Sequence, residues 1–283
     1  MGPPSRRSLL AGLVCAAVAG CSRRAKDERV VTYSYGTADA QVADLWLPTT
    51  RSSDAVVVLL HGGFWQSGYE RSLEDAVAAD LVGRGRPVWN VDYRPVGDGG
   101  GWPATFADVA AGLDLLTEAG AEHGLDVGRV AVVGHSAGGT LALWAAARHL
   151  LPADAPGSRP VVRPVAAVSQ SGVNDLAAGA RAGLGGGAVV SLLGTGPDDD
   201  PHDIYRLASP AELAPIGVPT LAVTGEDDGL VPPAQSTSYA EAARAAGDDV
   251  TLEVVPGEDH FAHLDPSSRC WELTRTWLAQ HLP

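Results

Sequence analysis

Apolar runs that alternate with segments of helical spacing recur along most of the chain. Two alternating runs at 30–36 and 41–48 flank a small polar turn and predict an antiparallel hairpin. Continuous apolar runs rich in Val, Leu and Ala predict strands that are buried on both faces. These runs lie at 55–60, 87–94, 129–134, 164–172, 219–225 and 251–257.

Segments with helical periodicity lie between or after these strands, at 72–85, 103–124, 137–151, 233–247 and 267–281. Such alternation implies parallel βαβ units. We therefore expect an α/β fold with a mostly parallel central sheet, an N-terminal antiparallel hairpin and helices on both faces. The pattern breaks at 173–216, which is rich in Gly and has no strand pattern. We expect a small cap or insertion there and not a second domain.

Residues 1–20 differ in kind from the rest. Arg6 and Arg7 precede an apolar run that is shorter than the ~20 residues of a membrane-spanning helix. The stretch resembles a twin-arginine export signal, and "VAGC" at 18–21 resembles the lipobox of bacterial lipoproteins. The resemblance implies that Cys21 carries a lipid that anchors the protein to a membrane on the extracytoplasmic side of the cell envelope. An ordinary secretory signal with a Cys at this place by chance is the alternative.

Composition is consistent with one globular domain after this leader. We divide the chain into a signal peptide at 1–20, a linker at 21–29 and a single domain at 30–283. Apolar residues make up 45% and charged residues 19% of the sequence, as in globular proteins. The net charge of −14 argues against nucleic-acid binding and against a polybasic membrane patch. Cys270 is left without a partner, so we expect no disulfide and a small buried side chain.

The pentapeptide "GHSAG" at 134–138 stands between a predicted strand and a predicted helix. This is the context that a nucleophile elbow of the form G-x-S-x-G requires. The sharp turn needs tiny neighbours, and it places Ser136 at a helix N-terminus that favours developing negative charge. A glycine-rich helix entry without chemistry is the competing interpretation.

A serine nucleophile needs a base and an acid that orients the base. Candidates follow two later strands, Glu226, Asp227 and Asp228 in "GEDDGLVP" and Asp259, His260 and His263 in "GEDHFAH". The carboxyl ends of parallel strands meet at one edge of the sheet, so these side chains are expected near Ser136.

Together, "HGGFW" at 61–65, "GHSAGG", "GEDDGLVP" and "GEDHF" resemble the motifs of α/β-hydrolase-fold esterases. The resemblance covers about 30–282 and is closest to the group of bacterial esterases and kynurenine-formamidase-like (arylformamidase) enzymes. It implies the order serine, acid, histidine, and it selects Asp228 and His260. Asp227 remains the alternative acid. His263 remains the alternative base, and without that role it is expected to be a polar surface or cap residue.

The resemblance also assigns a role to "HGGFW". It implies that the oxyanion hole consists of the Ala137 amide and amides of the loop at Gly62 and Gly63. His61 is expected to support this loop structurally. Aromatic residues that follow strand ends are candidates for the walls of the substrate pocket. They are Phe64, Trp65, Trp102 and Phe261, whereas Trp144 and Trp271 fall in helices and are expected in the core.

The predicted activity is hydrolysis of a carboxylic ester, or of a small formamide or other amide, through an acyl-enzyme. No P-loop, dinucleotide-binding or zinc-type pattern occurs, so neither a cofactor nor a metal is expected. The acidic loop "PDDDPHD" at 197–203 is expected to bind no cation. The alternatives are an exopeptidase of the same fold and, in another class, a non-catalytic binding lipoprotein tethered to the cell surface.

Overall fold

The computed structural model describes residues 28–282, so the predicted signal, Cys21 and most of the linker lie outside the described residues. Within this part, eight strands form one sheet in the order β1-β2-β4-β3-β5-β6-β7-β8. The strands are β1 (Glu28–Ser34), β2 (Val42–Pro48), β3 (Ala55–Leu60), β4 (Val88–Val91), β5 (Asp126–His135), β6 (Ala166–Gln170), β7 (Thr220–Gly225) and β8 (Val250–Val255).

The strand pairing confirms the predicted sheet. β1 and β2 pair antiparallel, β2 joins β4 antiparallel, and β3 to β8 run parallel to one another. All residues of β3 are buried, as expected for a central strand that is covered on both faces. The carboxyl ends of the parallel strands therefore meet along one edge, where the candidate residues follow β3, β5, β7 and β8.

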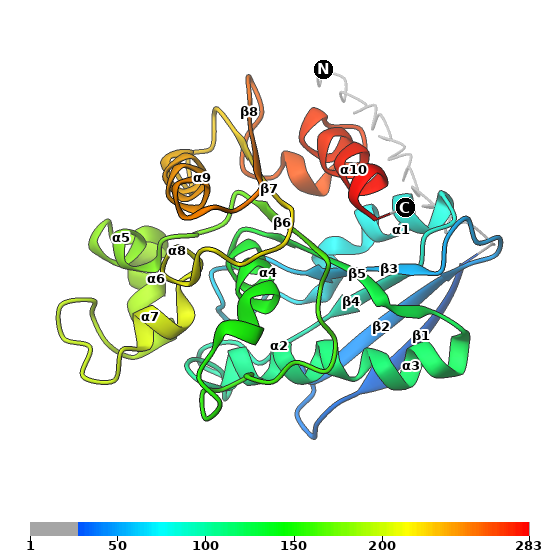
Figure 1. Ribbon diagram of the computed structural model, residues 1–283, viewed down its shortest axis with the longest axis horizontal. Coiled ribbons are helices and arrows are strands. Elements are labelled where there is room, and N and C mark those ends of the chain that lie inside the picture. Colours follow the sequence, from blue (N-terminus) through cyan, green and yellow to red (C-terminus); the bar gives the residue numbers. More distant parts are fainter. Residues whose placement is uncertain (1–27, 283) are drawn as a thin grey trace, which may run out of the picture.

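Helices cover both faces of the sheet (Figure 1). On one face, α1 (Asp75–Gly83) and α10 (Arg269–His281) pack over a core that contains Trp271 and Cys270. The other face holds a second core, formed with α2 (Ala104–Asp114), α3 (Leu116–His123), α4 (Ala137–Ala147) and α9 (Ala234–Ala246). Trp144 belongs to this second core, so the expectation for both tryptophans and for Cys270 is confirmed.

One predicted helix, 103–124, is divided into α2 and α3. The division follows Gly112, whose carbonyl accepts a hydrogen bond of 2.8 Å from the Trp89 indole. That carbonyl is the normal acceptor for the amide four residues later, so the indole competes with the helix for it. Sequence periodicity cannot detect this competition because Trp89 lies on a strand.

The segment 173–216 forms a small cap without strands among its described residues. It contains α5 (Leu176–Arg181), α6 (Leu184–Leu193), α7 (Ile204–Ala208) and α8 (Pro210–Leu213). Figure 1 shows these helices together at one end of the sheet, beside α9. The cap prediction is therefore confirmed.

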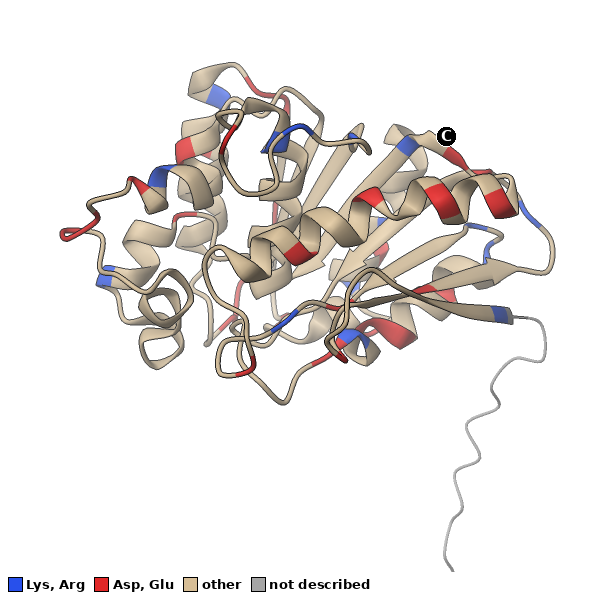
Figure 2. Ribbon diagram, turned by 90° about the horizontal axis from the view of Figure 1, so that it is seen from below, with Lys and Arg blue, Asp and Glu red and all other residues tan. Residues whose placement is uncertain are grey.

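Acidic residues are spread over several helices and loops and are not confined to one element (Figure 2). This distribution matches the net charge of −14 of the whole sequence. In the described range 28–282, no helix combines the length and the apolar character that crossing a lipid bilayer requires.

A buried carboxyl makes the stability of the fold depend on pH. Glu74 ends the 3-10 helix η1 (Arg71–Glu74) and is 1% exposed. Its Oε1 atom has no hydrogen-bond partner among the described residues. Burial, with a smaller contribution from Asp75, raises the pKa of Glu74 from 4.5 to about 8. The folded protein therefore keeps this proton over a pH range in which the unfolded chain loses it.

We predict that Glu74→Gln removes part of this pH dependence. The stabilisation from the retained proton is complete below about pH 4.5 and is lost as the pH rises towards about 8. The loss is at most about 1.4 kcal/mol for each pH unit in that range. Thermal unfolding at pH 5 and pH 8 should show a smaller decrease in Tm for the variant. Glu70→Gln, at an exposed site, controls for the removal of one acidic group, and an unchanged slope in Glu74→Gln would contradict the prediction.

Candidate active site

Ser136 occupies a sharp turn between β5 and α4. Its backbone has φ 55° and ψ −119°, which is a strained conformation for a residue with a side chain. A Cβ atom on Gly134 would overlap the backbone of Gly138, and one on Gly138 would overlap the carbonyl of Leu60. Both glycines of the pentapeptide are therefore required by close backbone approach, as in a nucleophile elbow.

Asp228 and His260 are joined directly. Nδ1 of His260 donates to Oδ2 of Asp228 at 2.7 Å, and both residues are buried. Oδ1 of Asp228 accepts hydrogen bonds from the amides of Leu230 and Val231, at 2.9 and 2.8 Å. Asp227 is exposed. Of the two aspartates, only Asp228 is thus placed to orient the imidazole of His260.

The environment of Asp228 favours the carboxylate. Burial alone would raise its pKa, but several interactions outweigh burial and lower it. These are the hydrogen bonds from His260 and from the Val231 amide, together with the charge of His260. Asp228 is therefore suited to stabilise a positive charge on His260.

His135 brings the base beside the elbow. Nε2 of His135 donates to the backbone carbonyl of His260 at 2.8 Å, and the centres of their rings are 4.7 Å apart. Because His135 directly precedes Ser136, this bond places the chain segment of His260 next to the serine. No hydrogen bond joins the Ser136 hydroxyl to His260 among the described residues. Such contacts are often long without substrate.

The loop after β3 faces the elbow. A Cβ atom on Gly62 would lie 3.1 Å from Cβ of Ser136, so the loop backbone passes directly beside the serine. Gly63, Phe64 and Trp65 follow with φ of 111°, 50° and 58°, a run of left-handed residues that turns the backbone sharply. Ala137 begins α4, and its N–H has no carbonyl partner within the helix. Gly62 therefore lies beside Ser136, and Gly63 and Ala137 are the next residues along the chain from these two.

His61 supports this loop from beneath, in line with its expected structural role. Its ring stacks on Tyr93 at a centre-to-centre distance of 4.2 Å, and Nε2 contacts Asp92 at 3.0 Å. Tyr93 closes the arrangement by donating its hydroxyl to the His61 carbonyl at 2.8 Å. Arg71 also binds Asp92, at 3.1 Å. The start of the loop is therefore fixed by a buried polar cluster.

The aromatic residues that were predicted to line the substrate pocket lie in different environments. Trp65 is only 1% exposed and donates its indole N–H to the Ala137 carbonyl at 3.2 Å, so it supports the elbow from the core instead of lining a pocket. Phe64 packs against Gly185 of the cap. Trp102 is partly buried against Phe106. Phe261 is 58% exposed and stands beside His260 with a ring-centre distance of 5.4 Å.

The structure corrects the expectation for His263. Its side chain is completely buried, so it is neither a surface nor a cap residue. Its Nε2 atom contacts the hydroxyl of Ser171 at 2.9 Å. Burial, and then the proximity of His135 and His260, lower the pKa of His263 well below its usual value. Because its Nε2 contacts the Ser171 hydroxyl and its lowered pKa makes it a weak proton acceptor, His263 is less suited than His260 to deprotonate Ser136.

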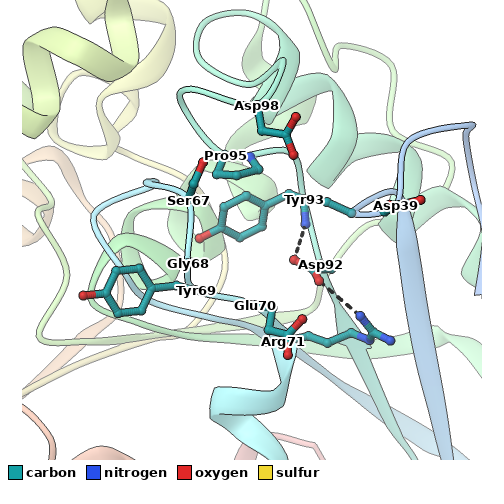
Figure 3. A pocket seen from close by; sticks show the side chains of 11 residues that line it. Asp39, Ser67, Gly68, Tyr69, Glu70, Arg71, Asp92, Tyr93, Pro95 and Asp98 are labelled. Carbon is teal, nitrogen blue, oxygen red and sulfur yellow. Dashed lines mark hydrogen bonds and ion pairs between the residues drawn. The ribbon is translucent and has the colours of Figure 1, made fainter.

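A hollow of about 220 Å³ opens beside the loop after β3 (Figure 3). Tyr69 forms part of its wall and also packs on Gly63, so the hollow adjoins the loop after β3. Carboxylates dominate the lining, and Arg71 is the cation among the lining residues. The acidic members are Asp39, Glu70, Asp92 and Asp98. This adjoining hollow was not apparent from sequence patterns.

No group of His, Cys, Asp or Glu side chains that could hold a metal ion occurs within residues 28–282. The residues gathered at the sheet edge are a hydroxyl, an imidazole and a carboxylate with free amides nearby. This arrangement is suited to acyl transfer through a serine nucleophile.

The sheet order, the elbow and the cap define the α/β-hydrolase fold. Structural comparison agrees with this fold. A truncated carbohydrate esterase from gut microbiota superimposes with a TM-score of 0.79 over 91% of this chain and 98% of that one, at 20% identity. Esterase B from Lactobacillus rhamnosis gives a TM-score of 0.76 over 90% of this chain and 85% of that one, also at 20% identity.

Residues 43–242 match the BD-FAE family model, and the chain belongs to that family. Among curated proteins, Carboxylesterase NlhH of Mycobacterium tuberculosis is 38% identical over 115 residues, which are 41% of this chain and 35% of that one. Esterase LipI of the same organism is 35% identical over 105 residues, 36% of this chain and 32% of that one. The chain thus aligns with about a third of the length of these relatives.

Proposed function

We propose that the protein is a serine hydrolase of carboxylic esters, with Ser136 as nucleophile, His260 as base and Asp228 as the acid that orients it. The observation that carries the proposal is the His260–Asp228 hydrogen bond of 2.7 Å beside a strained serine elbow. The esterases among the relatives and the structural neighbours support the same reaction class.

In this mechanism, Oγ of Ser136 attacks the ester carbonyl while its proton passes to Nε2 of His260. Asp228 stabilises the imidazolium through Nδ1. Amides of Ala137 and of the Gly62–Gly63 loop stabilise the oxyanion, and removing one such donor typically costs about 3 kcal/mol of transition-state stabilisation. The tetrahedral intermediate collapses, and His260 returns the proton to the departing alcohol. Water then attacks the acyl-serine while His260 takes its proton. His260 returns that proton to Oγ of Ser136 as the carboxylic acid is released.

The leaving group extends towards the acidic hollow in this proposal. Tyr69 connects the oxyanion loop to the hollow, whose carboxylates accept hydrogen bonds and repel anions. Neutral, hydroxyl-bearing alcohols fit such a lining, and one structural neighbour is described as a carbohydrate esterase. An arylformamidase-type reaction, which the "HGGFW" resemblance implies, uses the same triad. Its substrate N-formylkynurenine carries both an ammonium and a carboxylate group, so the acidic hollow does not exclude it.

We predict that Ser136→Ala abolishes hydrolysis of p-nitrophenyl acetate and butyrate by the purified protein. The loss in kcat should exceed about a thousandfold, because the nucleophile is removed while the fold is retained. A fluorophosphonate probe should label the wild type and fail to label the variant. Ser267→Ala, at an exposed serine, is the control and should retain activity. Retained hydrolysis in Ser136→Ala would refute the proposal, and a wild type that binds no probe would favour the non-catalytic binding protein.

We also predict discrimination by leaving-group charge. 4-Acetoxybenzamide and 4-acetoxybenzoate differ mainly in one negative charge, so their kcat/KM ratio reports the field of the hollow. Repulsion of about 1 kcal/mol gives roughly a fivefold preference for the neutral ester. Asp98→Asn should reduce that ratio without changing the rate for the neutral ester. N-Formylkynurenine in the same assay tests the formamidase alternative, which a higher kcat/KM than that of every ester would favour.

Export and lipid anchoring at Cys21 remain part of the proposal, supported by the sequence pattern at 18–21. We predict that the mature protein begins at Cys21, carries acyl mass and sediments with membranes. Cys21→Ala should abolish the acyl mass and release the protein from membranes, because the modified thiol is absent. Cys270→Ala is the matched control and should remain membrane-bound. An unmodified N-terminus at another residue would contradict this prediction.

A further inference from the structure

An open apolar groove of about 240 Å³ lies between the cap and α9, separate from the acidic hollow. One wall consists of α5 and the start of α6, and the other consists of the residues that lead into α9 and its first turns (Figure 1). Apolar side chains provide most of the lining, from Ala178, Ala182, Leu184, Pro232 and Ala234. Such a surface suits an alkyl group, because removing apolar surface from water is favourable.

The polar groups of Asp175 and Gln235 join the two walls of this groove. Gln235 accepts the Asp175 N–H through Oε1 at 2.9 Å and donates through Nε2 to the Asp175 carbonyl at 3.3 Å. The Asp175 side chain accepts the Ala178 N–H at 2.8 Å and so caps α5. Ser238 is the remaining polar residue of the lining and is exposed. The bonds between α5 and α9 therefore set the width of the groove.

The loop after β7 connects Asp228 to the groove. The amides of Leu230 and Val231 bind the Asp228 carboxylate, at 2.9 and 2.8 Å, and the next residue, Pro232, lines the groove. The Leu230 side chain is 44% exposed. The loop thus presents apolar side chains between Asp228 and the groove.

The segment after β6 connects the elbow to the opposite wall. A Cβ atom on Gly139, in the first turn of α4, would lie 3.0 Å from Cα of Gly172. This segment therefore passes directly beside the helix whose N-terminus carries Ser136. Asp175, which lines the groove, follows three residues after Gly172. Both walls of the groove are thus continuous with segments that begin at the candidate active site.

The groove and the acidic hollow lie on opposite sides of the elbow. In the sheet order, β5 stands between the pair β4–β3 and the pair β6–β7, and Ser136 directly follows β5. Most residues of the hollow follow β3 or β4, whereas those of the groove follow β6 or β7. Phe64 bridges the two sides, because its ring packs on Gly185 and the preceding residue, Leu184, lines the groove. A molecule at Ser136 therefore has an acidic depression on one side and an apolar one on the other.

We propose that this groove binds the acyl chain of the ester substrate and that it selects linear alkyl chains longer than acetyl. The alcohol then lies towards the acidic hollow, and the acyl chain runs from Ser136 past Leu230 to Ala178 and Leu184. Phe64 forms the wall between the two arms of the ester. The inference rests on the proposed function, because only a substrate bound at Ser136 brings its acyl chain to the groove.

Hydrolysis of p-nitrophenyl acetate, butyrate and hexanoate by the full-length protein measures this selection, because the leaving group is constant. We expect kcat/KM to rise about twofold with each methylene from acetate to hexanoate. A fully buried methylene would give roughly a fourfold rise, and an open groove covers only about half of the chain. A kcat/KM that stays flat or falls along this series would overturn the inference.

Two substitutions of Ala178 should change the selection in opposite directions. Leu and Glu are similar in size, both suit a helix, and Ala178 is exposed. Ala178→Leu extends the apolar lining and should raise the ratio of kcat/KM for hexanoate over acetate about threefold. Ala178→Glu places a charge beside the alkyl chain and should lower that ratio at least about fivefold.

The same two substitutions at Ala245 are the matched control. Ala245 is an exposed residue of α9 that does not line the groove, so the ratio should equal that of the wild type. Thermal unfolding of each variant is measured alongside. Equal ratios in the two Ala178 variants, or a change in the same direction in both, would overturn the inference.

The decisive observation is the path of an alkyl chain that is attached to Ser136. Ethyl p-nitrophenyl octylphosphonate should form a bond between its phosphorus and Oγ of Ser136 and lose p-nitrophenolate, while the serine proton passes to His260. A crystal structure of this adduct should show the octyl chain between α5 and α9. A chain that lies in the acidic hollow or touches neither wall of the groove would overturn the inference alone. Failure to modify Ser136 would overturn the proposed function, and the inference with it.

Discussion

The site depends on one close approach, between the first turn of α4 and the end of β3. Gly138 lies so near the Leu60 carbonyl that no side chain fits there, and a Cβ atom on Gly62 would make a tight contact of 3.1 Å with Cβ of Ser136. This approach fixes the distance between Ser136 and the loop after β3, because both are continuous with buried strands. A larger residue at either glycine would separate them, and in the proposed mechanism the loop amides would then no longer face the developing charge.

The core supplies the energy that maintains this geometry. Every residue of α4 is buried, so the helix is held on all sides and its N-terminus cannot withdraw from the strand ends. Each strained backbone position costs on the order of 1–3 kcal/mol, and fully burying one large aliphatic side chain returns about as much. Trp65 contributes directly, since its indole binds the Ala137 carbonyl within that packed region. Packing of α4 and Trp65 therefore holds the backbone of the elbow in its strained conformation.

Much of the fold could be predicted from sequence because its signals are local. Apolar runs and helical spacing indicate the strands and helices, and strand ends carry Ser136, Asp228 and His260 in order. The interpretation of Trp65 and His263 was wrong because burial depends on neighbours that are distant in sequence. Trp65 turns inward through left-handed φ values at Gly63, Phe64 and Trp65 itself, which no propensity for Phe or Trp predicts.

Two buried histidines near His260, namely His135 and His263, share a lowered pKa. Burial, together with the charge of His260, lowers the pKa of His135 to about 3, and the pKa of His263 is lowered for similar reasons. Both rings therefore remain uncharged at neutral pH. A neutral imidazole can donate a hydrogen bond to a carbonyl or a hydroxyl without adding positive charge, whereas an arginine in the same place would repel the imidazolium. The proposed acyl transfer needs a single transient cation there, paired with Asp228, and the neighbouring rings preserve that condition.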